Sequence, residues 1–372
     1  MFDIPKTMRA VVYRGVNDLR VETVPVPRIG ANELLVRVAV CGVCPTDIKK
    51  IQYGTVPPPR IFGHETAGTI VRVGTRVRGF KIGERVALHH HVPCMDCHFC
   101  RHRAFAQCAT YKRTGITAGF EPAGGGYAEY VRVMKFVLPG VVKIPTRNSF
   151  EEGAMLEPVN TVLKGIKRLN LLRGDVVLVA GQCPIGLMFT RLLQLQGVKV
   201  IATDLLESRL KLAKQFGARW TCLASQLSSL VTRHSSPIDA AIIAVPSDTA
   251  VKQALQLVRG AGQVLLFAHT KKADNGMQKS EARPPSSVLR PPSSGLCPLD
   301  LASVCLDEKD LLGSYSADFT LQREVARLVF SRQLDVRGLI THRFTLAETA
   351  DAIRLASNPK PDSLKILVEQ TS

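Results

Sequence analysis

Four cysteines lie within a span of 15 residues, at Cys94, Cys97, Cys100 and Cys108. Cysteines separated by two residues are poorly placed to form a mutual disulfide, but they can converge on one ion. Four thiolates in a closed tetrahedral shell suit a structural zinc ion. An iron–sulfur cluster is the competing interpretation, but ferredoxin motifs usually place the fourth cysteine three residues after the third and follow it with proline. Here the last gap is seven residues and Ala109 follows, so the spacing favours zinc.

A second set of metal-binding residue types is dispersed along the chain. It comprises Cys44, two residues before Thr46, the pair His64 and Glu65, and Glu157 before Pro158. One cysteine, one histidine and carboxylates would make a zinc site of mixed ligands with an open position, where the metal can acidify an alcohol oxygen. Taken singly, each has an ordinary structural explanation: a buried cysteine, a hydrogen-bonded histidine, a surface glutamate. Spacing alone does not join them.

A glycine-containing turn follows the apolar run 175–180 and could bind a dinucleotide. The turn consists of Gly181, Gln182, Cys183, Pro184, Ile185 and Gly186. Such a turn brings the N-terminus of a helix, with its free N–H groups, close to a pyrophosphate. Cys183 stands where the Gly-x-Gly-x-x-Gly pattern has its middle glycine, and its side chain is expected to weaken binding or to shift the cofactor.

An acidic residue follows at the expected distance from this turn. Asp204 ends the next apolar run, 23 residues after Gly181. An acid at this position binds the ribose hydroxyl groups and repels a 2′-phosphate, which favours NAD over NADP. The alternative for Asp204 is a plain strand-end cap. Arg209 either borders the ribose or is a solvated helix arginine.

Two kinds of periodicity divide the chain. The first 150 residues alternate apolar and polar positions, as in 36–40 and 68–74, and Gly and Pro punctuate them, which predicts a small β-barrel with long loops. From about residue 159, continuous apolar runs alternate with helical patterns at 185–196 and 207–216. Those runs are 175–180, 198–203, 240–245 and 262–267. This alternation predicts a doubly wound parallel sheet, and Gly313-Ser314-Tyr315 is expected to close its last strand.

Two later segments are assigned separately. Residues 271–296 are rich in Pro and Ser and repeat Arg-Pro-Pro-Ser-Ser, which predicts a surface loop or insertion. The apolar segment 364–368 is expected to be a strand that packs back on the first domain.

Composition limits the functional class. The chain has 372 residues, of which 45% are hydrophobic, and fits two domains. No apolar run of 18 residues and no secretory signal is visible, so no membrane partner and a cytoplasmic location are expected. The net charge of +18 admits a nucleic-acid surface. Because the Lys and Arg residues are scattered, a basic solvated surface and no nucleic-acid partner are the preferred interpretation.

Taken together, these motifs resemble the zinc-containing medium-chain dehydrogenase/reductase family, in its sorbitol, threonine and polyol dehydrogenase branch. The resemblance covers nearly the whole chain and also includes Gly124-Gly125-Gly126-Tyr127-Ala128-Glu129-Tyr130. It implies an α/β fold with a GroES-like barrel, residues 1–158, carrying a zinc lobe near 90–110. A Rossmann domain, 159–317, and a returning segment, 318–372, complete it. The active site is expected in the cleft, and the assembly is expected to be a homodimer or homotetramer.

The resemblance also assigns roles to residues. Cys44, His64 and Glu157 would hold catalytic zinc, directly or through water, and Glu65 would lie beside the metal and ligate it in some members. Thr46 would take the substrate proton, Asp47 would fix the site, and Cys41 would only pack. The implied reaction is hydride transfer from a secondary alcohol or polyol to NAD, giving a ketone or aldehyde.

Other features keep alternatives open. Relatives carry a histidine three residues after the Thr46 position as a proton relay, whereas this chain has Lys49. The alternative functions are an NADP-dependent carbonyl reductase, against which Asp204 argues, and a zinc-stabilised binding protein that has lost catalysis, which Cys183 and Lys49 keep open. The run His89-His90-His91 is either an extra metal site or, preferably, an incidental part of a loop.

Overall fold

The computed structural model describes residues 3–89, 92–110, 125–233, 237–268 and 299–370. The chain forms two compact units, one made of residues 1–164 with 315–372 and the other of residues 165–314. From the sequence, the domain boundaries were predicted at residues 158 and 317. The functional assignment of the domains within those boundaries stays a prediction. The Pro/Ser-rich segment 271–296, His90, His91 and Gly124 lie outside the described residues.

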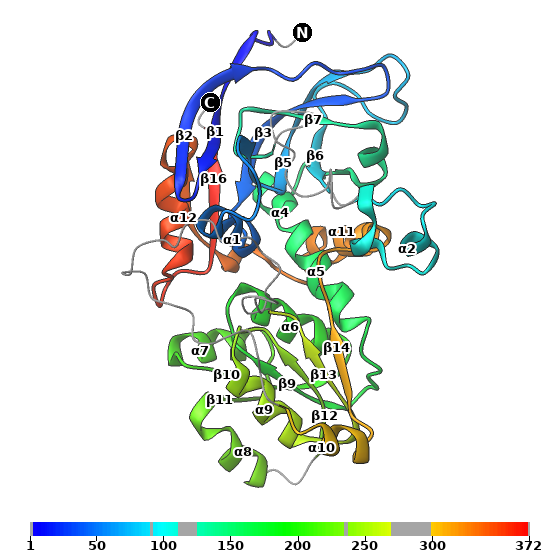
Figure 1. Ribbon diagram of the computed structural model, residues 1–372, viewed down its shortest axis with the longest axis vertical. Helices are drawn as coiled ribbons and strands as arrows, with labels where there is room; N and C mark the ends of the chain where they lie inside the picture. Colours follow the sequence, from blue (N-terminus) through cyan, green and yellow to red (C-terminus); the bar gives the residue numbers. More distant parts are fainter. Residues whose placement is uncertain (1–2, 90–91, 111–124, 234–236, 269–298, 371–372) are drawn as a thin grey trace. The chain divides into compact units, whose positions relative to one another are not determined.

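The unit of residues 165–314 is built on a six-stranded parallel sheet (Figure 1). Its order is β11-β10-β9-β12-β13-β14. The strands are β9 (Val176–Ala180), β10 (Lys199–Asp204), β11 (Trp220–Leu223), β12 (Ile238–Ile243), β13 (Val258–Leu266) and β14 (Asp310–Gly313). Counted along the chain this is the order 3-2-1-4-5-6 of dinucleotide-binding sheets. The predicted doubly wound parallel sheet is therefore confirmed.

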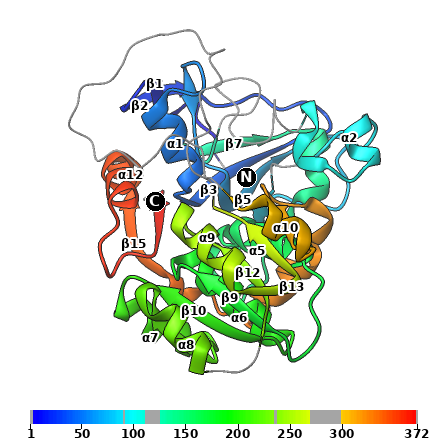
Figure 2. The same cartoon turned by 60° about the horizontal axis from the view of Figure 1, so that its bottom comes forward.

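Helices cover this sheet, and its central strand is buried along its whole length. The helices are α6 (Pro184–Leu195), α7 (Glu207–Gln215), α8 (Leu227–Arg233), α9 (Asp248–Leu257) and α10 (Leu301–Leu306), with a 3-10 turn at Ala224–Gln226. Residues of α8 and α9 pack with Val176, Leu178 and Ala180, and α9 lies beside β12 and β13 (Figure 2). The helices α6 and α7 contact β9, β10 and β11.

The last strand of this sheet closes where the sequence predicted. Gly313-Ser314-Tyr315 was expected to close it, and β14 ends at Gly313. Ser314 still donates its N–H to the carbonyl of Leu266 at 3.1 Å, after which the chain leaves the sheet.

The described residues of the unit 1–164 and 315–372 form two sheets. A three-stranded sheet has the order β2-β1-β4, and a seven-stranded sheet has the order β15-β16-β3-β5-β6-β8, with β7 also paired to β3. The strands are β1 (Thr7–Gly15), β2 (Asp18–Pro25), β3 (Leu34–Gly42), β4 (Arg60–Ile61), β5 (Glu65–Val73), β6 (Arg85–Leu88), β7 (Tyr130–Val133), β8 (Val142–Lys143), β15 (Ile340–Thr345) and β16 (Lys365–Glu369). The predicted return of the C-terminal strand is confirmed, because β16 pairs with β3.

Short helices connect these strands, and α12 lies beside β15 and β16 (Figure 1). The helices are α1 (Pro45–Tyr53), α2 (His98–Arg101), α4 (Phe150–Ala154), α5 (Leu156–Ile166), α11 (Gln322–Phe330) and α12 (Thr349–Ser357). Turns of 3-10 helix occur at Phe105–Gln107, Lys135–Gly140, Phe319–Leu321, Arg337–Leu339 and Leu346–Glu348.

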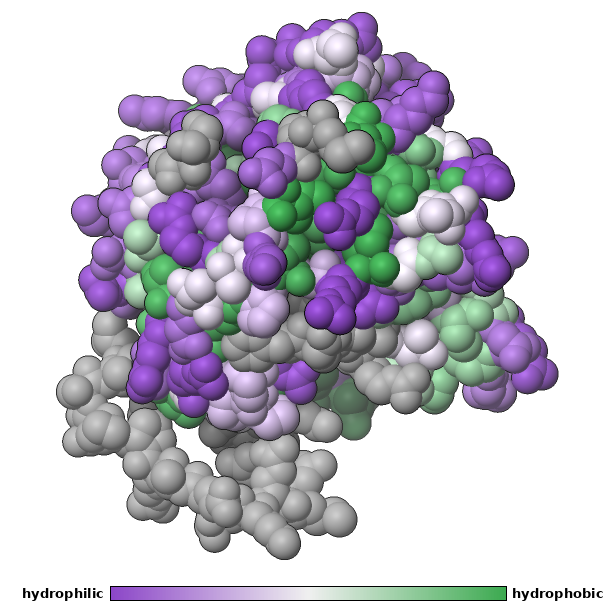
Figure 3. Space-filling model, turned by 90° about the horizontal axis from the view of Figure 1, so that it is seen from above, coloured by the Kyte–Doolittle hydropathy of each residue, from purple (hydrophilic) through white to green (hydrophobic). Residues whose placement is uncertain are grey.

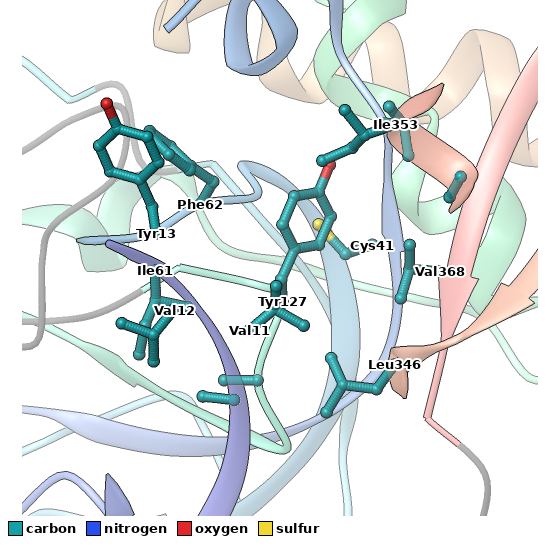
Figure 4. Close-up of a cluster of buried hydrophobic side chains, with 14 of the residues drawn as sticks. Val11, Val12, Tyr13, Cys41, Ile61, Phe62, Tyr127, Leu346, Ile353 and Val368 are labelled. Carbon is teal, nitrogen blue, oxygen red and sulfur yellow. The ribbon is translucent and has the colours of Figure 1, made fainter. Parts of the chain in front are cut away.

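Aromatic and aliphatic side chains from both sheets form the core of this unit (Figure 4). Tyr13 meets Phe62 edge to face, with ring centroids 5.2 Å apart. Cys41 is fully buried in the same cluster, where burial raises the pKa of its thiol to about 12. Cys41 therefore packs in the core.

Hydrophilic side chains dominate the face drawn in Figure 3, around a smaller hydrophobic area. Basic residues form surface ion pairs, such as Arg14 with Glu22 and Lys143 with Glu84. These pairs agree with a basic solvated surface. Among the described residues, no helix combines the length and apolar character needed to cross a membrane.

Candidate active site and metal centres

Three potential ligands converge at one end of the seven-stranded sheet. Strand β3 ends at Gly42, opposite Glu65 at the start of β5 in the antiparallel register. Cys44 follows β3 as the residue preceding helix α1, and His64 precedes β5, so both lie at the same sheet end. One ligand atom from each of Cys44, His64 and Glu65 lies within 4.8 Å of the others. The pairing of strands β3 and β5 thus brings together residues that their spacing in the sequence could not connect.

Asp47 completes this group from the first turn of α1. It is fully buried, and its Oδ1 lies 3.2 Å from Nδ1 of His64. A carboxylate on one ring nitrogen orients a histidine so that the other nitrogen can bind a metal. Burial acts to lower the pKa of His64, but the charges of Asp47 and Cys44 outweigh it and raise this pKa well above its ordinary value. The local field therefore favours a cation, and one thiolate, one imidazole and one carboxylate suit zinc.

Glu65 has a second partner, Lys365 of β16, with which it forms a buried ion pair. The ammonium of Lys365 also donates to the carbonyl of Val43 at 3.0 Å. Burial acts to lower the pKa of Lys365, but the charge of Glu65 outweighs burial, and the pKa is raised. Lys365 is therefore charged beside the candidate metal site.

Glu157 lies near this site but outside its closest group. It is buried at the start of α5, and its charge acts on both Glu65 and Lys365. Its carboxylate is not part of the set of ligand atoms within 4.8 Å. The carboxylate grouped with Cys44 and His64 is thus that of Glu65, and a role for Glu157, directly or through water, stays a prediction.

Two further residues of α1, Thr46 and Lys49, lie close in sequence to Cys44. Thr46 is partly buried, two residues after Cys44. Lys49 lies three residues further, on the same side of the helix, and burial lowers its pKa. Lys49 is therefore a half-buried basic group one turn from Thr46.

The four-cysteine lobe forms a compact cluster of sulfur atoms. Ligand atoms of Cys94, Cys97, Cys100 and Cys108 all lie within 4.8 Å of one another, and all four cysteines are free of disulfides. The Sγ atom of Cys100 is 3.9 Å from that of Cys94 and 3.5 Å from that of Cys97. A tetrahedral shell with zinc–sulfur bonds of about 2.3 Å has sulfur–sulfur edges of about 3.8 Å. The separations therefore fit one zinc ion.

The glycine turn lies where β9 passes into α6. A Cβ on Gly181 would lie 2.2 Å from Cγ1 of Val245, and one on Gly186 would lie 1.8 Å from the carbonyl oxygen of Gly181. Both positions therefore require glycine. Cys183, at the middle position, has φ −66° and ψ 178°, which any residue can adopt. The backbone conformation at Cys183 does not require glycine. Glycine would be needed there only if a ligand approached the backbone closely.

Asp204 holds this turn from the end of β10. Its Oδ2 accepts the N–H of Gln182 at 2.6 Å, and its Oδ1 accepts the N–H of Leu206 at 3.0 Å. It therefore makes the contacts of a strand-end cap. Each carboxylate oxygen keeps a further acceptor position, which leaves the predicted ribose contact possible.

Arg209 is not the solvated arginine that the sequence allowed. Only 6% of its surface is exposed, and its Nη1 lies 2.5 Å from Sγ of Cys183. Burial raises the pKa of the Cys183 thiol, and the charge of Arg209 acts in the opposite direction. The side chain that replaces the middle glycine is thus paired with the arginine expected near the ribose.

Sequence reasoning missed Lys365 and its contact with Glu65. A signal existed, since a lysine interrupts the otherwise apolar run Leu364-Lys365-Ile366-Leu367-Val368. A charged residue in a buried strand usually has a partner. The partner itself could not be found, because it lies on a strand 300 positions earlier.

Comparisons with known proteins agree with this architecture. Residues 30–146 match the alcohol dehydrogenase GroES-like domain, and residues 184–290 match the zinc-binding dehydrogenase domain. The chain is 28% identical to a sorbitol dehydrogenase of Bombyx mori, over 96% of this chain and 97% of the relative. It is 27% identical to a sorbitol dehydrogenase of Bacillus subtilis (strain 168), over 98% of each.

Solved structures show the same similarity over nearly the full chain. A short chain alcohol dehydrogenase from E. coli CFT073, complexed with NADH, superposes with a TM-score of 0.83 at 25% identity, covering 98% of this chain and 100% of the other. A putative zinc-binding dehydrogenase from Sinorhizobium meliloti 1021, bound to NADP, gives 0.80 at 26% identity with the same coverage. The predicted pairing of a GroES-like domain with a Rossmann-like domain is confirmed.

Proposed function

Because the chain belongs to the zinc-dependent medium-chain alcohol and polyol dehydrogenases, we propose that Cys44 and His64 hold its catalytic zinc ion. The enzyme oxidises an alcohol or polyol with NAD(P). The convergence of Cys44, His64 and Glu65 over the buried Asp47 is the observation that carries the assignment. Zinc at this position supplies the Lewis acidity that lowers the pKa of a substrate hydroxyl group, and NAD supplies the hydride acceptor.

The surrounding residues position these groups and handle the proton. The carboxylate of Asp47 lies 3.2 Å from Nδ1 of His64 and so favours the ring orientation in which Nε2 faces the metal. The Thr46 hydroxyl takes the substrate proton, and Lys49, one turn further along α1, replaces the relay histidine of relatives. Burial lowers the pKa of Lys49, which makes its ammonium a better proton donor than that of an exposed lysine. The four-cysteine lobe holds a second, structural zinc ion.

NAD is the proposed cofactor within the NAD(P) class. The pyrophosphate binds at the turn from Gly181 to Gly186, before α6, and Asp204 and Arg209 border the ribose. The carboxylate of Asp204 disfavours a 2′-phosphate. Solved relatives bind either dinucleotide, so Asp204 carries this preference.

The substrate is proposed to be a secondary alcohol of the polyol class. Support comes from the relatives, which include sorbitol dehydrogenases and a probable D-xylulose reductase A from Aspergillus fumigatus. The enzyme is further proposed to act in the cytoplasm as a homodimer or homotetramer.

Metal analysis of variants tests the assignment of the two zinc sites. Wild-type protein should contain two zinc ions per chain, bind NADH and oxidise sorbitol or a related polyol. Cys44→Ser should lose one zinc ion and all turnover while keeping NADH binding, whereas Cys97→Ser should lose the other ion and mainly lower the melting temperature. Cys305→Ser is the matched control, since Cys305 is exposed and distant in sequence from both sites. A Cys44→Ser protein with two zinc ions and wild-type turnover would refute the proposal.

A further inference from the structure

Two basic side chains, Lys50 and Arg60, lie close to the last turn of helix α1. Lys50 belongs to that turn, and Arg60 begins strand β4. Arg60 pairs with Tyr13 of β1, and the hydroxyl oxygen of Tyr13 lies 3.8 Å from a Cβ built on Gly54, the residue that follows α1. Strand β1 therefore places Arg60 beside the end of the helix that carries Lys50.

Among the described residues, no acidic side chain forms an ion pair with Lys50 or Arg60. Arg60 donates its Nε–H to the carbonyl of Pro57 at 3.1 Å. Burial lowers the pKa of Lys50, and the charge of Arg60 acts in the same direction. The charges of Asp47 and Cys44 oppose this shift, but both residues belong to the metal site. An anion between the two cations would relieve both the burial of a charge and the repulsion between like charges.

Lys50 also lies on the face of α1 that carries Thr46. The two residues are four positions apart in the same helix, so their side chains are neighbours on its surface. Thr46 is the proposed acceptor of the substrate proton, and Cys44, which precedes the helix, is a proposed zinc ligand. The remaining atoms of a polyol whose reacting hydroxyl group meets Thr46 are therefore within reach of Lys50. A lysine in a last helical turn also favours the helix dipole, but that interaction does not require burial.

We propose that Lys50 and Arg60 determine substrate specificity by binding an anionic group, a carboxylate or a phosphate, on the polyol that the enzyme oxidises. The inference rests on the proposed function and narrows its substrate class from neutral polyols to sugar acids or sugar phosphates. The reaction is unchanged: a carbon bearing a hydroxyl group gives a hydride to NAD, and the hydroxyl group gives up its proton. An ammonium and a planar guanidinium together donate to several oxygens of the anionic group, which a neutral polyol lacks.

Three compounds with the same stereocentres test the charge. D-Sorbitol, D-gluconate and D-sorbitol 6-phosphate differ at a terminal carbon, which carries a hydroxyl group, a carboxylate or a phosphate. The kcat and KM of NAD-linked oxidation are measured for wild type, Lys50→Met, Lys50→Arg and Arg60→Gln. Where an anionic compound is not oxidised, its Ki as a competitor of sorbitol replaces the KM. Lys135→Met is the matched control, because Lys135 is an exposed lysine of the same unit.

Wild type should bind one of the two anionic compounds at least tenfold more tightly than sorbitol, and the preferred compound distinguishes a carboxylate from a phosphate. Lys50→Met and Arg60→Gln should each reduce this preference roughly tenfold, through KM or Ki rather than kcat, because each removes a charge-assisted hydrogen bond. Lys50→Arg should retain the preference, and so should the control.

The inference alone is overturned if wild type binds sorbitol as tightly as both anions, or if Lys50→Met and Arg60→Gln weaken all three compounds equally. Arg60→Gln carries the test if Lys50→Met does not fold. A zinc-loaded wild type that oxidises none of the three compounds and binds no NADH would overturn the proposed function as well.

Discussion

The thiol of Cys183 occupies the turn position at which a dinucleotide-binding fold brings its backbone closest to the pyrophosphate, and its removal should strengthen NADH binding. The change to test is Cys183→Gly. The native φ of −66° is open to any residue, so glycine introduces no strain. Glycine at the N-terminal cap of α6 costs only a few tenths of a kcal/mol. The remaining loss is the 2.5 Å contact with Arg209. For a weak sulfur partner this contact contributes about 1 kcal/mol, or a melting shift of about 2–4 °C.

The gain in affinity comes from two sources. The backbone can approach the phosphates, and Arg209 is released for a charge-assisted hydrogen bond with the cofactor. One such bond contributes about 1.5 kcal/mol, which corresponds to a roughly tenfold lower Kd for NADH.

Fluorescence titration of NADH measures this Kd directly, and the melting temperature is recorded alongside. Cys183→Ser keeps a polar atom beside Arg209 and should bind NADH like wild type, while Cys305→Ser controls for loss of an exposed thiol elsewhere in the same unit. Tenfold weaker binding by Cys183→Gly would show that the thiol supports the cofactor and that the reasoning is wrong.

Three further changes test other contacts. Asp47→Asn should lower catalytic zinc affinity by about 10–100-fold, measured by chelator competition, because the carboxylate orients His64. Asp204→Asn should raise kcat/KM for NADP relative to NAD and lower the melting temperature, because its carboxylate both repels the 2′-phosphate and holds Gln182. Burial acts to raise the pKa of Glu152, but hydrogen bonds from Arg332 and Ser149 outweigh burial, and the pKa is lowered overall. The ionised Glu152 therefore stabilises the folded protein above the unfolded pKa of about 4.5, and this stabilisation is lost as the pH falls through the folded pKa. Glu152→Gln should therefore lower the melting temperature at pH 7 and leave it nearly unchanged near pH 3.

The parallel sheet was predictable because its central strands are covered on both faces. Val176–Ala180 is buried at every position, and such a strand appears in the sequence as an unbroken apolar run. The spacing of Asp204 from Gly181 was informative for a related reason, since Asp204 ends β10 and Gly181 follows β9 at the same edge of the parallel sheet. The four-cysteine lobe is local in sequence, so its convergence needed no knowledge of the fold.

The active site was harder to predict from the sequence, because it depends on strand register. Cys44 meets His64 only because β3 and β5 pair with Gly42 opposite Glu65, and two irregularities in this pairing, near Leu35 and Val38, set that register. A bulge of this kind leaves little trace in an alternating pattern. Arg209 was ambiguous for the same reason, since its burial against Cys183 arises from packing between segments and not from the helix that carries it.

The pairing of β16 with β3 also sets an order of events during synthesis. Lys365 and Val43, which hydrogen-bond across these strands, are 322 residues apart in sequence. At roughly 5–20 residues per second, a ribosome needs tens of seconds to make the intervening chain. The parallel-sheet unit is continuous in sequence and can fold during that interval, whereas the end of β3, from Val40 to Gly42, waits with one edge unpaired. Such an edge is open to pairing with other chains, so the newly made chain is exposed to aggregation until β16 has been made.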